Sequence, residues 1–166
     1  MSHQLSPLEL KSLIWRAADA IHGTRMTTAE MTECVLTLVA LKRLSDVFDW
    51  HREMVLYEAR SKGKRIDARK NHYFYGAAVF VPESARWDWM VANLAHGIGK
   101  GLVAAFQQIL EHNPHLGNMC SPADAERAGS LLAKLSDNVL RSQMRELSAY
   151  RLSDGRHECQ PCCPMT

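Results

Sequence analysis

The sequence predicts an all-α protein, a compact bundle of about five helices with one long helix and an extended aromatic and basic loop. Three observations predict this class: capping sequences precede apolar residues at helical spacing, the links are short, and no alternating strand–helix pattern is present. The 166 residues suffice for one domain with a real core. We expect a helical domain over residues 1–150 and an irregular Cys-rich tail over residues 151–166.

The first helix is predicted from the stretch Ser6-Pro7-Leu8-Glu9. A serine can cap a helix, a proline suits its first position, and a glutamate three residues after the serine completes a capping box. A glycine at position 23 ends the element, because glycine adopts the left-handed conformation without a side-chain penalty. Between these two signals the apolar residues at helical spacing are Leu10, Leu13, Ile14, Ala17 and Ile21.

The second helix is the long one. Thr27 and Glu30 repeat the capping pattern, and we expect the helix to run to about Arg60. Its apolar stripe consists of Met31, Cys34, Val35, Leu38, Leu41, Leu44, Val47 and Phe48. A polar, basic stretch over residues 61–72 follows, and residues 73–81 are aromatic and β-branched enough for a short strand or an extended loop.

Three more helices are predicted in the second half. Pro82 and Glu83 open a short helix that continues through Trp87 and Met90. The next helix follows the glycines at residues 97–101 and has a stripe of Ile98, Leu102, Ala105, Phe106, Ile109 and Leu110. Asn113-Pro114 stops it. Ser121-Pro122 starts a last helix that carries Leu131, Leu132, Leu135 and Val139 and extends to about Tyr150.

The stretch HGIGKGL, residues 96–102, admits two interpretations. A dinucleotide-binding loop needs a strand before its glycines, and the residues WDWMVANLA before these ones are helical in pattern. A P-loop needs Gly-Lys-Ser/Thr, whereas Lys100 is followed by Gly101. We therefore favour a flexible turn into a helix, with a local anion contact at the helix start left open.

The segment KGKRIDARKNHYFYG is the best nucleic-acid candidate. Cations neutralise phosphates and aromatic faces stack on bases, although a solvated loop whose aromatic residues turn into the core is the common alternative. The candidate DNA contacts are Lys62, Lys64, Arg65, Arg69 and Lys70. Trp87 and Trp89 lie two positions apart on a helix, so they face different ways, one into the core and the other nearer a surface or partner. The candidate interface residues are Arg86, Trp87 and Trp89.

Composition and motifs exclude several classes. The net charge of +2 is small, no run of about 18 apolar residues is present, and the N-terminus lacks a secretion signal, so we expect a cytoplasmic location. Cys34 and Cys120 stand alone, which fits reduced thiols. We expect no metal site, because the tail HECQPCC has no second ligand pair upstream. We also expect no catalytic residue, since no Gly-x-Ser-x-Gly elbow or paired acid and base is evident.

Three blocks of the sequence, taken in order, match the pattern of one known family. The first block is matched by Trp15, Ala17, Ala18, Asp19, Met26, Glu30, Leu41, Lys42, Leu44, Ser45, Asp46 and Phe48. The second, VFVPESARWDWM, is matched by Phe80, Val81, Pro82, Glu83, Ala85, Arg86 and Trp87. The third is the Ile-Gly-Lys-x-Leu helix that ends in Glu-x-Asn-Pro, and the three blocks span residues 8–118. In this order they resemble the N-terminal domain of the modification (M) subunit of type I restriction–modification systems.

The resemblance implies a function that composition alone does not indicate. In this family a separate α/β domain binds S-adenosylmethionine and methylates adenine N6 on DNA, through a glycine-rich donor loop and an Asn/Asp-Pro-Pro-Tyr/Phe motif that this chain lacks. The chain itself is therefore expected to bind no cofactor. Two M subunits and one specificity subunit enclose DNA, and the helical N-terminal domains help to close that clamp. The expected partners are the DNA backbone, the specificity subunit and the second M subunit.

Two alternatives remain open on the sequence. The chain could instead be a stand-alone helical interaction protein that binds the specificity or M subunit, or a small enzyme that uses the glycine stretch. A dedicated partner binds its subunit tightly, and a nucleotide-binding enzyme gains heat stability from nucleotide or methyl donor.

Overall fold

The computed structural model describes residues 3–4, 8–9, 11–12, 15–16, 19, 26–67, 79–118 and 122–151. Within these ranges the α-helices are α2 (Thr28–Ser61), α3 (Trp87–Asn93), α4 (Ile98–His112), α5 (Pro122–Leu132) and α6 (Asp137–Ser148). Two short 3-10 helices are η2 (Glu83–Ala85) and η3 (Pro114–Asn118). The all-α prediction is confirmed. The apolar stripe of the first predicted helix and the Cys-rich tail after Arg151 lie outside the described residues.

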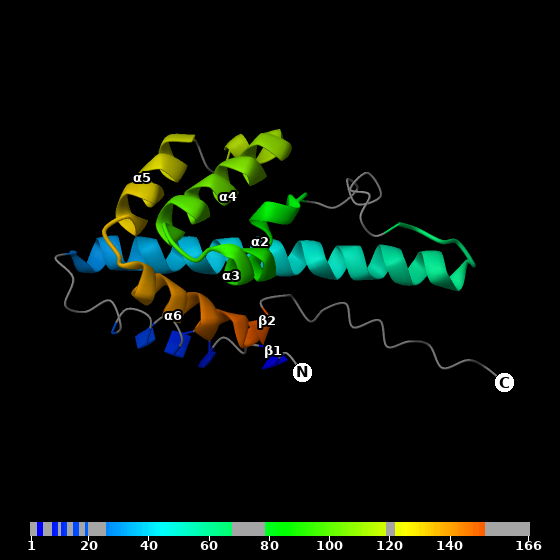
Figure 1. Cartoon of the computed structure of the whole chain (residues 1–166), viewed down its shortest axis with the longest axis horizontal. Helices are drawn as coiled ribbons and strands as arrows, with labels where there is room; N and C mark the ends of the chain where they lie inside the picture. Colours follow the sequence, from blue (N-terminus) through cyan, green and yellow to red (C-terminus); the bar gives the residue numbers. More distant parts are fainter. Residues whose placement is uncertain are drawn as a thin grey trace.

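The long helix α2 begins and ends where the sequence predicts. The hydroxyl of Thr27 accepts a hydrogen bond from the backbone N–H of Glu30 at 3.3 Å, and the Glu30 carboxylate accepts one from the N–H of Thr27 at 2.8 Å. These reciprocal bonds form a capping box. The helix runs 34 residues to Ser61 and buries one apolar stripe that ends with Phe48 and Ala59. Its far end extends beyond the other described helices (Figure 1).

The prediction of one short helix from Pro82 to Met90 is wrong. The structure has the 3-10 turn η2, then Arg86 in an extended conformation (φ −71°, ψ 141°), then the separate helix α3. A long-range contact explains the break. The backbone N–H of Trp87 donates a hydrogen bond to Ser45 Oγ on α2 at 2.8 Å, so α2 satisfies an N–H that the start of α3 leaves free.

The prediction of one helix from Ser121 to about Tyr150 is also wrong. A turn separates α5 from α6, and the hydroxyl of Ser136 accepts a hydrogen bond from Val139 N at 3.4 Å as the N-cap of α6. The Ser136-Asp137 pair is an ordinary N-terminal signal, but the apolar spacing through Leu135 conceals it. The second of the two helices, α6, ends at Ser148, close to the predicted end at about Tyr150.

The long helix α2 contacts α3, α5 and α6, and α4 packs against both α5 and α6 (Figure 1). The largest fully buried side chains are Trp87, Phe48, Leu38, Leu41, Met90, Ile98, Leu102, Ile109 and Leu132. A glycine on α4 allows this helix to lie close to the backbone of α5. A Cβ atom at Gly99 would lie 3.2 Å from the carbonyl oxygen of Leu132, so a larger residue would push the two helices apart.

A two-residue parallel pairing joins the ends of the described chain. β1 (His3–Gln4) pairs with β2 (Tyr150–Arg151). Nearby, a guanidinium nitrogen of Arg16 lies 3.3 Å from the hydroxyl of Tyr150 and 3.3 Å from the carboxylate of Glu146. The sequence allowed a short strand or an extended loop at residues 73–81. Val79, Phe80 and Val81 do not form a strand, and residues 73–78 lie outside the described part of the chain. Among described residues, no helix is long and apolar enough to cross a membrane.

Candidate functional site

The glycine stretch is a helix start whose anion position is already filled by the protein. Gly97 has φ 62° in the left-handed region and precedes α4 directly. The backbone N–H groups of Gly97 and Ile98 donate to the two carboxylate oxygens of Asp137, each at 2.9 Å. The carboxylate thus takes the place that an external anion would have at this helix N-terminus. The bend is confirmed at Gly97, whereas Gly99 and Gly101 lie within α4.

We predict that Asp137→Asn lowers stability in a pH-dependent way. The two backbone hydrogen bonds, from Ile98 and then Gly97, lower the pKa of the Asp137 carboxyl. A lowered folded-state pKa contributes stability above the unfolded value of about 3.9, and this contribution disappears as pH falls through the folded value. Urea unfolding should therefore separate the variant from the original protein at pH 7, and the gap should narrow at pH 3, below the unfolded-state pKa. The exposed control Glu111→Gln should follow the original protein, and an equal gap at both pH values would refute the prediction.

The described part of the basic segment lies exposed at the end of α2. Lys62, Lys64 and Arg65 are exposed, and Gly63 between them has φ 66°. Lys62 Nζ is 3.7 Å from the carboxylate of Glu58, a solvent-screened pair. Exposed cations thus follow the C-terminal end of α2, where this helix projects from the bundle (Figure 1), and Tyr57 near the same end is exposed as well. Arg69, Lys70 and the aromatic residues 73–75 lie outside the described residues, so their part in this surface stays a prediction.

The two tryptophans differ as the spacing predicts. Trp87 is 1% exposed, and its indole N–H donates to Ser148 Oγ at 2.9 Å. Trp89 is 38% exposed. The burial of Trp87 leaves Arg86 and Trp89 as the interface candidates that a partner can reach, and their contact with a partner stays a prediction.

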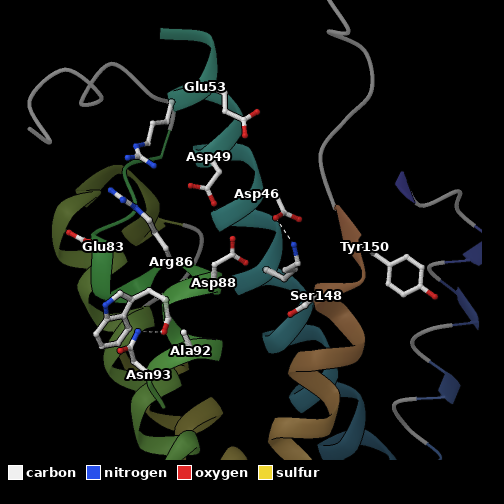
Figure 2. A pocket seen from close by; sticks show the side chains of 13 residues that line it. Asp46, Asp49, Glu53, Glu83, Arg86, Asp88, Ala92, Asn93, Ser148 and Tyr150 are labelled. Carbon is white, nitrogen blue, oxygen red and sulfur yellow. Dashed lines mark hydrogen bonds and ion pairs between the residues drawn. The ribbon is translucent and has the colours of Figure 1, made fainter. Parts of the chain in front are cut away.

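A cleft of about 680 Å³ opens between α2 and α3 beside these two residues. Figure 2 shows Asp46, Asp49 and Glu53 on the α2 side and Glu83, Arg86 and Asp88 on the opposite side. The remaining lining residues are Lys42, Arg52, Trp89, Ala92, Asn93, Ser148 and Tyr150. Of this set, sequence reasoning proposed only Arg86 and Trp89 as interface candidates. It named Lys42, Asp46 and Glu83 only as matches to the family blocks. The acidic residues on α2 are three to four positions apart, so they lie on one face of the helix. This spacing is the sequence signal that could have indicated the acidic side of the cleft.

Charge in the cleft is unevenly paired. Lys42 Nζ lies 2.5 Å from Asp46 Oδ1 in a buried pair. Burial raises the pKa of the Asp49 carboxyl above its usual value. The Arg86 and Arg52 guanidiniums lower this pKa, and the Asp88 and Asp46 carboxylates raise it further. Burial also lowers the pKa of the Arg86 guanidinium, as does the nearby charge of Arg52. The cleft therefore holds carboxylates close to other carboxylates and one guanidinium close to another.

The Arg86 side chain lies in the cleft against the ring of Phe48. Its guanidinium carbon lies 5.2 Å from the centre of the Phe48 ring, a cation–π contact that fixes its stem. Its Nε is buried, and no described residue accepts a hydrogen bond from it. Because this nitrogen has almost no exposed surface, a molecule in the cleft does not reach it as the side chain lies here.

A family model described as the HsdM N-terminal domain matches residues 10–147. That range covers most of the chain and all of its described helices except the last residue of α6. The chain belongs to the HsdM N-terminal domain family. It is an N-terminal domain of the M subunit of type I restriction–modification systems, as the three sequence blocks predict. No curated protein sequence matches the chain significantly.

Several HsdM signature residues build the scaffold. Ser45 of the first block holds the N–H of Trp87 in the second block. Asn113 of the third block is 3% exposed and bonds the backbone of Phe80: its Oδ1 accepts from Phe80 N and its Nδ2 donates to Phe80 O, both at 2.7 Å. The blocks are far apart in sequence, and buried polar contacts join them. Sequence reasoning used Asn113 only as a helix stop and missed this role.

Proposed function

We propose that this HsdM N-terminal domain positions DNA by its phosphates and supports subunit assembly, while another domain carries out adenine-N6 methylation with S-adenosylmethionine. The observation that carries the proposal is the exposed basic end of α2. Exposed lysine and arginine side chains bind phosphates without reading bases, which suits a clamp whose sequence reading belongs to the specificity subunit. The specificity subunit and the second M subunit are the proposed protein partners.

The test replaces Lys62, Lys64, Arg65, Arg69 and Lys70 with glutamine in the assembled type I complex. Each lost phosphate contact removes about one unit from the slope of log affinity against log salt concentration. We therefore expect weaker DNA binding on all sequences alike and a salt slope lowered by up to about five units. Fluorescence anisotropy at several salt concentrations, on cognate and unrelated duplexes, measures both quantities.

A matched control separates this surface from net charge alone. Lys100 on α4 and Arg145 on α6 are also exposed, and changing both to glutamine should leave the salt slope nearly unchanged. Equal effects per charge in the two sets would assign DNA binding to overall charge. An unchanged slope in the five-residue variant would exclude the DNA contact while leaving the family and fold intact.

A further inference from the structure

The basic end of α2 finishes in a turn that depends on one glycine. The backbone N–H of Gly63 donates to the carbonyl of Arg60 at 3.0 Å, and the N–H of Lys64 donates to the carbonyl of Ala59 at 2.8 Å. These two bonds define a Schellman motif, in which the residue after the helix cap is left-handed. Gly63 is that residue, with φ 66°, and the turn brings Lys64 back beside the last turn of the helix.

The turn gathers cations that would otherwise separate. Arg60 lies in the last turn of α2, Lys62 is its cap residue, and Lys64 and Arg65 follow the glycine; all four side chains are exposed. Because the N–H of Lys64 is bonded back to the last turn, the cations after the glycine stay close to those before it. An extended chain would instead carry them away from the helix by about 3.3 Å per residue.

Positive charge at this turn exceeds what the protein supplies to balance it. Residues 58–65 contain these four cations and one carboxylate, that of Glu58, which lies 3.7 Å from Lys62 Nζ and is solvent-exposed. The negative end of the helix dipole offsets a further part, because it favours cations at a helix C-terminus. A phosphate backbone carries about one negative charge per 1.7 Å of duplex, so it complements several closely spaced cations at once.

We infer that Gly63 is a positioning residue for DNA: its left-handed conformation holds Lys64 and Arg65 beside the cations of the last turn of α2, so that one stretch of phosphate backbone meets them together. The inference rests on the DNA-positioning role proposed above. It assigns to a residue without a side chain the geometry on which the charged contacts depend.

The test compares Gly63→Asn, Gly63→Ala and Gly63→Val in the assembled type I complex, by fluorescence anisotropy on cognate and unrelated duplexes. A Cβ atom at Gly63 would meet nothing within 4 Å, so space does not separate the variants. Asparagine adopts the left-handed region readily, alanine at a cost, and a β-branched valine hardly at all. DNA affinity should therefore fall least for asparagine and most for valine. For Gly63→Val we expect about tenfold weaker binding and a salt slope lowered by up to about two units, because the contacts of Lys64 and Arg65 are lost.

Gly97 supplies a matched control. It is also left-handed, at φ 62°, with nothing within 4 Å of an added Cβ atom, and no run of cations follows it in the sequence. The same three substitutions at Gly97 should lower the melting temperature of the chain in the same order but leave DNA affinity and salt slope unchanged, measured at a temperature where circular dichroism shows folded protein. If valine unfolds the domain, the alanine and asparagine variants still test the order.

Three results would overturn the inference: normal DNA binding by folded Gly63→Val, equal losses of DNA affinity in the Gly63 and Gly97 series, or an affinity order that follows side-chain size, with asparagine below alanine. The five-glutamine variant described above separates this inference from the proposed function. If that variant loses DNA affinity while Gly63→Val does not, the positioning role fails and the DNA proposal stands. If the five-glutamine variant binds DNA normally, the DNA proposal itself fails.

Discussion

Replacing Asn113 with alanine should destabilise the domain by roughly 2–5 kcal/mol. The substitution leaves the N–H and carbonyl of Phe80 buried without their partner, and each such group costs about 1–3 kcal/mol. It also removes the bond from Asn113 Nδ2 to the carbonyl of Ile109 at 2.6 Å. Phe80 packs edge-on against Phe48, with ring centres 5.4 Å apart, so a loosened Phe80 also disturbs the core against α2. Urea unfolding followed by circular dichroism measures the change.

Two companion variants test the cause. Gln107→Ala alters an exposed residue of the same helix and should change stability by no more than about 0.5 kcal/mol. Asn113→Asp keeps the acceptor for Phe80 N but presents a carboxylate oxygen to two carbonyls, so it should be destabilising at pH 7 and less so in acid, where a protonated carboxyl can donate. A cost for Asn113→Ala as small as that of Gln107→Ala would show that water satisfies the Phe80 backbone.

Local signals in the sequence predicted the elements that are themselves local. The reciprocal bonds of Thr27 and Glu30 need only four residues, so the start of α2 follows from the sequence. The break between α5 and α6 does not, because apolar spacing continues across it. Its position depends partly on Asp137, whose carboxylate reaches backbone groups 39 and 40 residues earlier. Propensity and periodicity contain no information on such a contact.

The same distinction applies to the candidate sites. The cations at the end of α2 lie within four consecutive residues, so the sequence alone predicts that they form one exposed group. The cleft brings carboxylates of α2 together with others 30 or more residues away in η2 and α3. Each of these acids alone resembles an ordinary solvated charge. Only packing around Ser45 and Trp87, which fixes α3 against α2, gives them a common site.

Removing one partner of the buried Lys42–Asp46 pair should cost about 3–5 kcal/mol. Both residues are almost fully buried, 5% and 7% exposed, and Asp46→Ala leaves the Lys42 ammonium without its nearest counter-charge at 2.5 Å. The double variant Lys42→Met/Asp46→Leu removes both charges and keeps apolar volume, so it should recover most of the loss. Urea unfolding of Lys42→Met, Asp46→Leu and the double variant completes a cycle that isolates the pair.

The same helix offers a matched control with the same spacing. Glu58 and Lys62 are also four residues apart, but both side chains are about two-thirds exposed, at 64% and 66%. Glu58→Ala should therefore cost at most about 1 kcal/mol, because water already solvates both charges. If Asp46→Ala costs no more than Glu58→Ala, burial does not strengthen the Lys42 pair, and water in the adjacent cleft must reach the ammonium. If the double variant instead remains as unstable as Asp46→Ala, the loss comes from packing at α3 and not from the uncompensated charge.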